Sequence, residues 1–196
     1  PQLLAYLDLL AKWNGHYNLS AVRDPQQMLK RHLLDCLAVL APLDRQLGAG
    51  RARVLDVGSG GGLPGVVLAV LRPSWVVCCV DAVAKKASFI RQVASELSLK
   101  NLQAEHSRVE SLVSPPFDVV VSRAFASLAD FCSLTRRHLD SDGVWMAMKG
   151  HVPDDEIAAL SRDVDVFHVE QLAVPGLQEQ RCLVWMRPGP HPRSAA

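Results

Sequence analysis

The residues of clearest chemical interest form one short segment, 54–65, which reads Val-Leu-Asp-Val-Gly-Ser-Gly-Gly-Gly-Leu-Pro-Gly. Its apolar start predicts a buried strand, and the run of glycines predicts a tight turn after it. Pro64 then suits the first turn of a helix, where its missing N–H has no partner to lose. Such a turn exposes backbone amides near the positive end of a helix dipole. Because ligands of open α/β sheets bind beyond the carboxyl ends of the strands, the segment predicts a cofactor site.

The glycine spacing discriminates between two classes of cofactor. The dinucleotide pattern G-x-G-x-x-G would start at Gly58 and Gly60, but Leu63 occupies its third glycine position. The segment instead satisfies D-x-G-x-G-x-G from Asp56, and so resembles motif I of class I S-adenosylmethionine-dependent methyltransferases. Asp81 closes the next predicted strand, where an acidic residue suits the ribose hydroxyls of an adenosine. These residues favour S-adenosylmethionine over a dinucleotide, and over a glycine turn that only packs a helix on a sheet.

The elements around this turn predict an α/β, Rossmann-like fold with a mostly parallel seven-stranded sheet. Strands and helices alternate from residue 52, which is typical of a parallel sheet with helices on both faces. The last two strands are separated by residues 174–177 without a helix, which predicts an antiparallel terminal hairpin. We expect strands near 53–57, 76–81, 101–105, 118–122, 143–148, 164–173 and 181–186, and helices near 64–71, 84–98, 127–139 and 153–161.

Two further helices are expected before the first strand. Apolar residues recur at helical spacing over 3–13 and over 26–40, and residues 14–18 between them are expected to form a loop. Asp24 is a candidate N-cap of the second helix. Pro42 and the glycines at 48 and 50 are expected to end this part. The predicted units are a helical extension over 1–48, a cofactor-binding domain over 49–187 and a disordered tail over 188–196.

Composition restricts the class of protein without naming a substrate. The 196 residues, 49% of them hydrophobic, suffice for a core but contain no run near the ~20 apolar residues of a membrane span. The net charge of +1 permits nucleic-acid binding without requiring it. Five cysteines without C-x-x-C spacing favour reduced structural thiols in a cytosolic protein, with no metal site. We therefore expect a cytoplasmic protein that does not contact membranes.

Several short elements outside the turn resemble one family. They are Trp13-Asn14, Tyr17-Asn18-Leu19, Arg23-Asp24-Pro25, Arg31-His32-Leu33-Leu34-Asp35, Leu63-Pro64-Gly65, Ser107-Arg108-Val109-Glu110, Ser122-Arg123-Ala124-Phe125-Ala126 and Lys149-Gly150. Together they resemble the glucose-inhibited division protein B family of bacterial 16S ribosomal RNA (guanine-N7) methyltransferases. The resemblance implies methyl transfer to N7 of a guanine in the 530 loop of that RNA. The RNA would be free, in an assembly particle or in the small subunit, and the protein a monomer that does not bind DNA.

The resemblance also implies roles for individual residues. Contacts to S-adenosylmethionine are expected from Gly58, Gly60, Leu63, Asp81, Val109, Glu110 and Arg123. Contacts to the RNA substrate are expected from Arg23, His32, Phe125 and Lys149. Arg123 is the expected catalytic residue, because it would order the methionine end of the cofactor and offer donors toward the base.

The chemistry of guanine N7 agrees with what the sequence lacks. This nitrogen has a free lone pair and no proton to lose, so positioning and electrostatics suffice without a general base. Enzymes that methylate exocyclic amines commonly carry an Asp/Asn-Pro-Pro-aromatic tetrad after the fourth strand, where this chain has Ser122-Arg123-Ala124-Phe125. None of the cysteines is placed to attack a pyrimidine. Both absences favour a ring nitrogen as the acceptor.

Each candidate residue also has a plainer interpretation. Arg123 could form a structural ion pair with Asp118 or Asp130, and Phe125 could be a core residue instead of stacking on the guanine. The other plain interpretations are a solvated helix N-terminus for Val109 and Glu110, an ion pair with Asp35 or a core position for His32, and a surface position for Lys149. Alternative functions are methylation of a small molecule or protein, or nucleotide binding without turnover.

Overall fold

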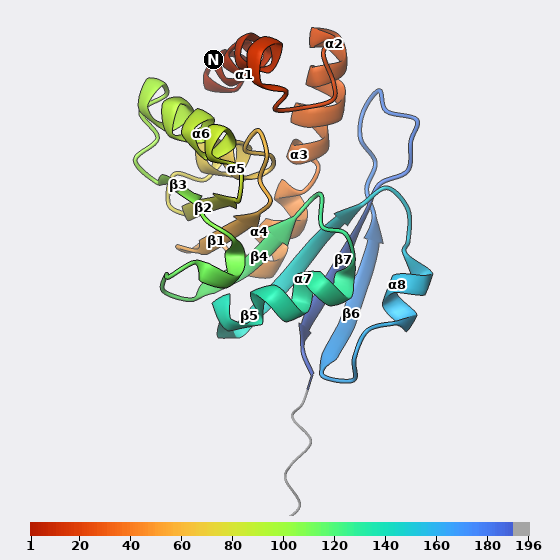
Figure 1. The fold of residues 1–196 in the computed structure, drawn as a ribbon. Coiled ribbons are helices and arrows are strands. Elements are labelled where there is room, and N and C mark those ends of the chain that lie inside the picture. The colour runs from red at the N-terminus through yellow and green to blue at the C-terminus, as the bar shows by residue number, and fades with distance from the viewer. Residues whose placement is uncertain (190–196) are drawn as a thin grey trace, which may run out of the picture.

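The computed structural model describes residues 1–189, in which a central sheet lies between helices (Figure 1). The strand order is β3-β2-β1-β4-β5-β7-β6, with β1 to β5 parallel and β7 antiparallel to both of its neighbours. The strands are β1 (Arg53–Val57), β2 (Val76–Asp81), β3 (Leu102–His106), β4 (Phe117–Ser122), β5 (Leu139–Lys149), β6 (Val164–Gln171) and β7 (Cys182–Pro188). The predicted fold class is confirmed, including the antiparallel terminal hairpin. The order reverses between β1 and β4, and such a point is where ligands bind in open α/β sheets.

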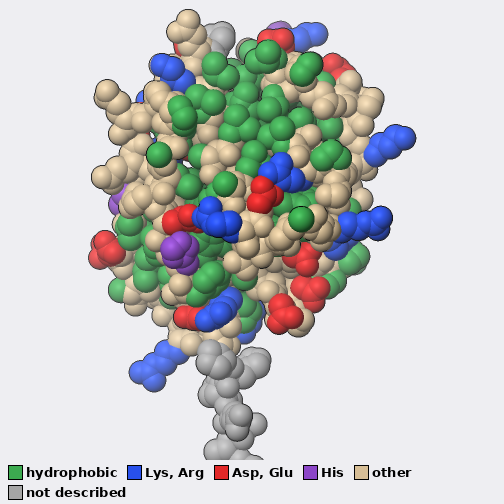
Figure 2. Space-filling model, turned by 180° about the vertical axis from the view of Figure 1, so that it is seen from behind, with side chains coloured by type: hydrophobic (Ala, Val, Ile, Leu, Met, Phe, Trp, Pro, Cys, Tyr) green, Lys and Arg blue, Asp and Glu red, His purple; other side chains and the backbone are tan. Residues whose placement is uncertain are grey.

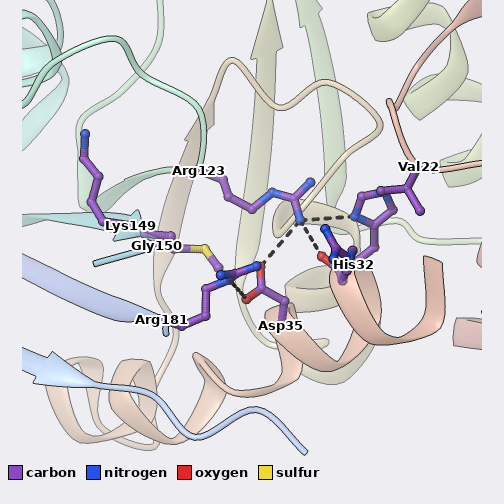
Figure 3. Close-up of a pocket in the computed structure, with 9 residues that line it drawn as sticks. Val22, His32, Asp35, Arg123, Lys149, Gly150 and Arg181 are labelled. Carbon is purple, nitrogen blue, oxygen red and sulfur yellow. Dashed lines mark hydrogen bonds and ion pairs between the residues drawn. The ribbon is translucent and has the colours of Figure 1, made fainter. Parts of the chain in front are cut away.

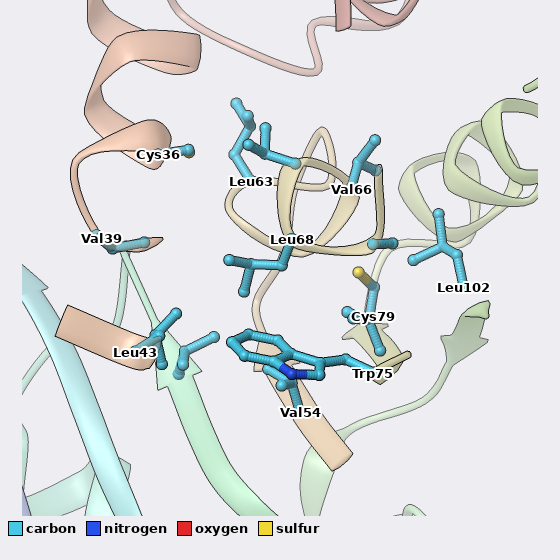
Figure 4. Close-up of a cluster of buried hydrophobic side chains, with 14 of the residues drawn as sticks. Cys36, Val39, Leu43, Val54, Leu63, Val66, Leu68, Trp75, Cys79 and Leu102 are labelled. Carbon is cyan, nitrogen blue, oxygen red and sulfur yellow. The ribbon is translucent and has the colours of Figure 1, made fainter. Parts of the chain in front are cut away.

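Successive strand residues belong alternately to two hydrophobic clusters, one on each face of the sheet. Val54 belongs to the cluster beneath α5, whereas its neighbour Leu55 belongs to the cluster beneath α7. Figure 4 shows the first cluster, in which Leu43 and Leu68 lie close to Val54 and Trp75. The adjacent cysteines of β2 divide in the same way, because neighbouring strand residues point to opposite faces. All five cysteines are buried and free.

The first helix of the extension is longer than predicted. Helix α1 (Gln2–Tyr17) continues through Asn14 and ends at Asn18, whose φ of 50° is left-handed. The expected loop over 14–18 is therefore wrong for its first four residues. Asn14 is buried, and its side chain donates to the Val22 carbonyl at 2.9 Å and accepts from the Ser20 N–H at 2.7 Å. Tertiary hydrogen bonds thus hold an amide side chain inside a helix, where its local preference favours a turn.

The second predicted helix is divided. The segment predicted over 26–40 forms α2 (Pro25–Met28), a π-helical segment (Leu29–Leu34) and α3 (Asp35–Leu37), and α4 (Leu40–Leu47) follows where no helix was predicted. Asp24 caps α2 as predicted, since its carboxylate accepts from the Gln27 N–H at 2.8 Å. Pro42 does not end the extension, because it lies in the first turn of α4, where its ring displaces no helical hydrogen bond. Gly48, with a φ of 71°, is where α4 stops.

The remaining helices agree with the expected order and differ at their ends. They are α5 (Gly65–Leu71), α6 (Ala84–Glu96), α7 (Leu128–Thr135) and α8 (Asp154–Ala158), with 3₁₀ turns at Val109–Ser111 and Arg136–His138. The tail begins later than predicted, because β7 reaches Pro188 and the Gly189 N–H donates to the Asp163 carbonyl at 2.7 Å. The rest of the predicted tail, 190–196, lies outside the described residues.

Helices α1 and α2 lie at the upper end of the molecule, and the face seen from behind is mostly hydrophobic there (Figures 1 and 2). Leu4 of α1 is 60% exposed and Leu29 is 38% exposed. Both belong to a shallow groove between α1 and α2. Within residues 1–189, no helix has the length and apolar character needed to cross a membrane.

Candidate active site

The glycine turn after β1 has the backbone geometry that its composition predicts. Gly58, Gly60 and Gly62 have φ angles of 66°, 57° and 88°, a region that residues with a Cβ rarely adopt. The Gly58 N–H donates to the Val80 carbonyl of β2 at 2.9 Å, which fixes the turn to the sheet. A Cβ at position 58 would meet nothing within 4 Å, so the turn faces open space at this residue. A ligand can therefore approach the bare backbone here.

Asp81 connects this turn to the end of β2. One oxygen of its carboxylate accepts from the Gly60 N–H at 2.9 Å, and the other accepts from the Val83 N–H at 2.9 Å. Lys86 lies 3.8 Å from the same carboxylate. Each carboxylate oxygen can accept more than one hydrogen bond, so Asp81 keeps capacity for hydroxyl groups of a ligand.

The turn opens onto a cavity of about 230 Å³, which we call the apolar cavity. It is lined by Val57, Gly58, Val80, Asp81, Ala82, Ser107, Arg108, Val109, Glu110, Phe125 and Leu134. Apolar side chains for a ring, a carboxylate beside them and a glycine backbone without side chains are the features that a nucleoside cofactor needs. The residues present therefore fit the adenosine part of S-adenosylmethionine.

A second cavity of about 380 Å³, the charged cavity, lies at the ends of β4 and β5. It is lined by Val22, Arg31, His32, Asp35, Arg123, Met148, Lys149, Gly150 and Arg181. Asp35 is the centre of the cluster in Figure 3: Arg181 donates to one of its oxygens at 3.0 Å, and Arg123 lies 3.7 Å from the other. Burial raises the pKa of Asp35, and the two guanidinium groups oppose that shift. Arg123 also donates to the Arg31 carbonyl at 3.4 Å.

His32 stands beside this cluster as a neutral side chain. Its Nε2 lies 2.6 Å from the Ser20 hydroxyl, and its Nδ1 lies 3.5 Å from the Arg123 guanidinium. Burial, and secondly the positive charge of Arg123, lower the pKa of His32 to about 4. The histidine is therefore uncharged at neutral pH and can hold a hydrogen bond without adding positive charge to the cavity.

The two cavities share the segment that follows β4. Arg123 lines the charged cavity, whereas Phe125, two residues later, lines the apolar cavity and packs on Phe131 with ring centroids 5.4 Å apart. The ion pairs suggested from sequence between Arg123 and Asp118 or Asp130 are wrong. Asp118 instead accepts from the Arg53 N–H, and Asp130 is bonded by the Ser127 hydroxyl.

The predicted site residues divide between the cavities and the rest of the molecule. Gly58, Asp81, Val109, Glu110 and Phe125 meet in the apolar cavity; His32, Arg123 and Lys149 meet in the charged cavity. The side chain of Leu63 is buried in the core beneath α5 and lines neither cavity. Gly60 lines neither cavity, and its N–H is bonded to Asp81. Arg23 also lies outside both, exposed and bonded to Asn18 at 3.2 Å.

Lys149 is placed at the rim and is already paired. Its ammonium group donates to both oxygens of Glu156 at 2.9 Å, and Figure 3 shows its side chain directed away from the Asp35 cluster. Glu156 also accepts from the Leu128 N–H, so this ion pair connects β5 to α7 and α8.

Sequence reasoning missed Arg181. It directly precedes β7, and β7 begins at the edge of the sheet where β5 ends, because the two strands are antiparallel and Cys182 pairs with Lys149. The predicted terminal hairpin carried this signal, since an antiparallel strand must start where its parallel neighbours finish.

Asp56 lies directly beneath the turn and is fully buried. Its Oδ2 accepts from the Gly65 N–H at 2.9 Å, which anchors the first turn of α5. Its Oδ1 has no hydrogen-bond partner among residues 1–189. Burial raises the pKa of Asp56 to about 7, so the carboxyl group is partly protonated near neutral pH.

Known proteins resemble this chain along nearly its whole length. The GidB family model, described as rRNA small subunit methyltransferase G, matches residues 1–184. The ribosomal RNA small subunit methyltransferase G of Leptothrix cholodnii is 63% identical over 95% of this chain and 85% of its own length. Its counterpart in Methylibium petroleiphilum is 62% identical over 94% of this chain and 84% of its own length.

Among solved structures, a SAM-dependent methyltransferase from Aquifex aeolicus superimposes with a TM-score of 0.61 at 17% identity, over 83% of this chain and 93% of that chain. This likeness supports the fold. The predicted family resemblance and S-adenosylmethionine as the cofactor are confirmed by the family match. The chain therefore belongs to the GidB family.

Proposed function

We propose that this protein transfers the methyl group of S-adenosylmethionine to N7 of a guanine in the 530 loop of 16S ribosomal RNA. The observation that carries the proposal is the meeting of two unlike cavities at residues 123–125: one suits a nucleoside, and the other presents arginines beside a buried carboxylate. The name of the relatives, ribosomal RNA small subunit methyltransferase G, supports ribosomal RNA as the substrate. We place the protein in the cytoplasm as a monomer.

In the apolar cavity the chain's own residues would hold the cofactor by its nucleoside. Val109 and Phe125 offer apolar surface to the adenine, and Asp81 offers oxygens to the ribose hydroxyls. Gly58, which has no side chain, leaves room for the methionine part of the cofactor, which would continue toward Arg123. When bound, S-adenosylmethionine supplies an electrophilic methyl group.

The charged cavity would orient the guanine and balance its charge. Arginine donors suit the O6 edge of guanine, which lies beside N7. Methylation at N7 leaves the base with a positive charge, which two arginines alone would oppose. Asp35 lies between Arg123 and Arg181 and offsets that repulsion, because a buried carboxylate acts strongly on a nearby charge.

The acceptor nitrogen needs no base, and the site agrees with that requirement. The one histidine among the residues lining the charged cavity, His32, is bonded to Ser20 and Arg123 and carries no charge at neutral pH. Acceleration would come from holding N7 in line with the methyl group and from the preorganised charges around it.

The RNA backbone would be bound at the rim. Arg31, whose side chain is 45% exposed, and Lys149 both line the charged cavity. The net charge of +1 means that this affinity is local and not a property of the whole surface. Binding through phosphates predicts a strong dependence on salt concentration.

A transfer assay with labelled S-adenosylmethionine tests the proposal. Free 16S ribosomal RNA, assembly particles and intact small subunits should be compared over several magnesium concentrations. The modified base should be located by reduction and aniline cleavage, which break RNA at N7-methylguanine. We expect label in one guanine of the 530 loop. Label at another position or on another atom would contradict the proposal, as would the absence of label in every RNA form.

A further inference from the structure

Helix α1 of the N-terminal extension directly contacts the glycine turn. The hydroxyl of Tyr6 donates to the Gly61 carbonyl at 2.7 Å, and the Tyr6 side chain is fully buried. Burial raises the pKa of Tyr6 well above its ordinary value, so the hydroxyl keeps the proton that it donates. A residue 55 positions earlier in the chain thus holds a backbone oxygen in the middle of the turn.

Leu10, one helical turn after Tyr6, contacts the same glycine. Its Cδ1 lies 2.9 Å from where a Cβ on residue 61 would stand, so a larger residue there would require the leucine side chain to move. The carbonyl of Leu19 lies 4.0 Å from where a Cβ on Gly60 would stand. The extension therefore approaches the turn at three points and lies against it.

The internal bonds of the turn do not include the Gly61 carbonyl as an acceptor. Gly62 and Leu63 donate to the Ser59 carbonyl at 2.7 and 3.1 Å, and Gly60 donates to Asp81. Tyr6 adds a bond from a different part of the chain, next to the amide that fixes Asp81. The Gly60 N–H and the Gly61 carbonyl belong to the two peptides that flank the Gly60–Gly61 peptide, so Asp81 and Tyr6 hold this dipeptide at its two ends.

We infer that Tyr6 is a positioning residue for the cofactor: through the Gly61 carbonyl it holds the glycine turn in the shape that receives S-adenosylmethionine. The inference rests on the proposed assignment of the apolar cavity to the cofactor. Tyr6 lines neither cavity and contacts the turn from its core side. Its effect on the reaction would therefore be confined to cofactor affinity.

The test compares Tyr6→Phe with a matched control, Thr135→Val. Tyr6→Phe keeps the ring against Phe89 and removes only the hydroxyl. Thr135 is equally buried, and its hydroxyl also donates to a backbone carbonyl, that of Phe131, on the opposite face of the sheet. Both variants lose a buried hydroxyl that donates to a carbonyl, but only one of these carbonyls belongs to the turn. The Thr135 hydroxyl also accepts from the Trp145 indole N–H at 2.8 Å, so the control loses one hydrogen bond more than Tyr6→Phe.

Calorimetric titration with S-adenosylmethionine should give a Kd roughly three- to tenfold higher for Tyr6→Phe than for wild type, as expected for one lost hydrogen bond. In the transfer assay the KM for the cofactor should rise by the same factor. The kcat at saturating cofactor and the KM for the ribosomal substrate should stay at wild-type values. Thr135→Val should lower the melting temperature and leave the Kd unchanged.

Equal cofactor affinity in wild type and Tyr6→Phe would overturn the inference, as would an equal loss of affinity in Thr135→Val, which would indicate general destabilisation. Failure of the cofactor assignment looks different. In that case Gly58→Leu binds S-adenosylmethionine as tightly as wild type does. This result would overturn the cofactor assignment and, with it, the positioning role of Tyr6.

Discussion

The two cavities that meet after β4 are built in opposite ways. Apart from Leu134 of α7, the apolar cavity is formed by residues at or just after the carboxyl ends of the parallel strands β1, β2, β3 and β4. The charged cavity combines the π-helical segment and α3 with residues from the ends of β4 and β5 and the start of β7. Glycine backbone and apolar side chains shape the first, whereas ion pairs around Asp35 shape the second.

On the proposed assignment, the difference separates the general part of the reaction from the specific part. A cofactor shared by many enzymes needs a site that the sheet itself provides. A single base in a large RNA needs donors placed by segments that vary around that sheet. The π-helical turn that presents Arg31 and His32 agrees with this division, since such turns occur often at functional sites.

The largest effect should come from filling the apolar cavity. Gly58→Leu places a side chain in the open space in front of the turn, and we expect S-adenosylmethionine affinity to fall by about 100-fold or more, because cofactor and side chain cannot share that space. Calorimetric titration measures it, with circular dichroism to verify the fold. Gly48→Leu is the control, since Gly48 has a φ of 71° and also faces open space, but at the end of α4. Equal losses in both variants would mean that backbone strain, and not occupancy, is responsible.

Removing the residue at the junction should mainly slow turnover. Arg123→Ala leaves Asp35 with Arg181 alone, and we expect kcat to fall about 10²- to 10³-fold, as when a preorganised donor is deleted. Single-turnover methylation of the ribosomal substrate measures it. Arg72→Ala breaks a comparable ion pair with Asp44, far from both cavities, and should keep wild-type turnover. A wild-type rate in Arg123→Ala under subsaturating cofactor would leave the arginine a structural role only.

Asp56 beneath the glycine turn and His32 in the charged cavity should change the free energy of unfolding with pH in opposite directions. The pKa of Asp56 is raised to about 7 in the folded protein, so its contribution to the free energy of unfolding falls as pH rises from about 4 to 7. The pKa of His32 is lowered to about 4, so its contribution is lost as pH falls from about 6.5 to 4. The two contributions oppose each other and are at most about 4 kcal/mol for Asp56 and about 3 kcal/mol for His32.

Urea unfolding of two variants between pH 4 and 7 separates these contributions. In Asp56→Asn the stability should rise more steeply with pH than in wild type, because the opposing contribution is gone. In His32→Gln the stability should fall more steeply with pH than in wild type, because the contribution that rises with pH is gone. Parallel profiles in wild type and both variants would contradict the assigned shifts.

The smallest effect is expected at the rim. Lys149→Met should weaken binding of the ribosomal substrate about two- to threefold and lower the slope of log affinity against log salt by about one, as for one phosphate contact. Glu156→Gln should act in the opposite direction, since it frees the Lys149 ammonium from its partner. Filter binding over a salt series measures both. No change in slope for either variant would remove Lys149 from the RNA contacts.

The sheet and the apolar cavity could be predicted because short-range patterns determine them. Buried apolar runs and glycines mark the strands and the turn, and the carboxyl ends of parallel strands must lie together, which unites Gly58, Asp81 and Val109. The extension could not be predicted in the same way. Asn14 is helical because of contacts with residues 20 and 22, and the π-helical segment has no local sequence signal. Tyr6 and Arg181 act through partners 55 and 146 residues away in sequence. The division into an extension over 1–48 and a domain over 49–187 remains a prediction.

The most direct test is a crystal structure with S-adenosylhomocysteine, the product form of the cofactor. We expect its adenine in the apolar cavity between Val109 and Phe125 and its ribose hydroxyls on Asp81. Its sulfur should point toward Arg123, and the charged cavity should stay free for a base. Adenosine bound instead among Arg31, Asp35 and Arg181 would contradict the division of the site into a cofactor side and a substrate side.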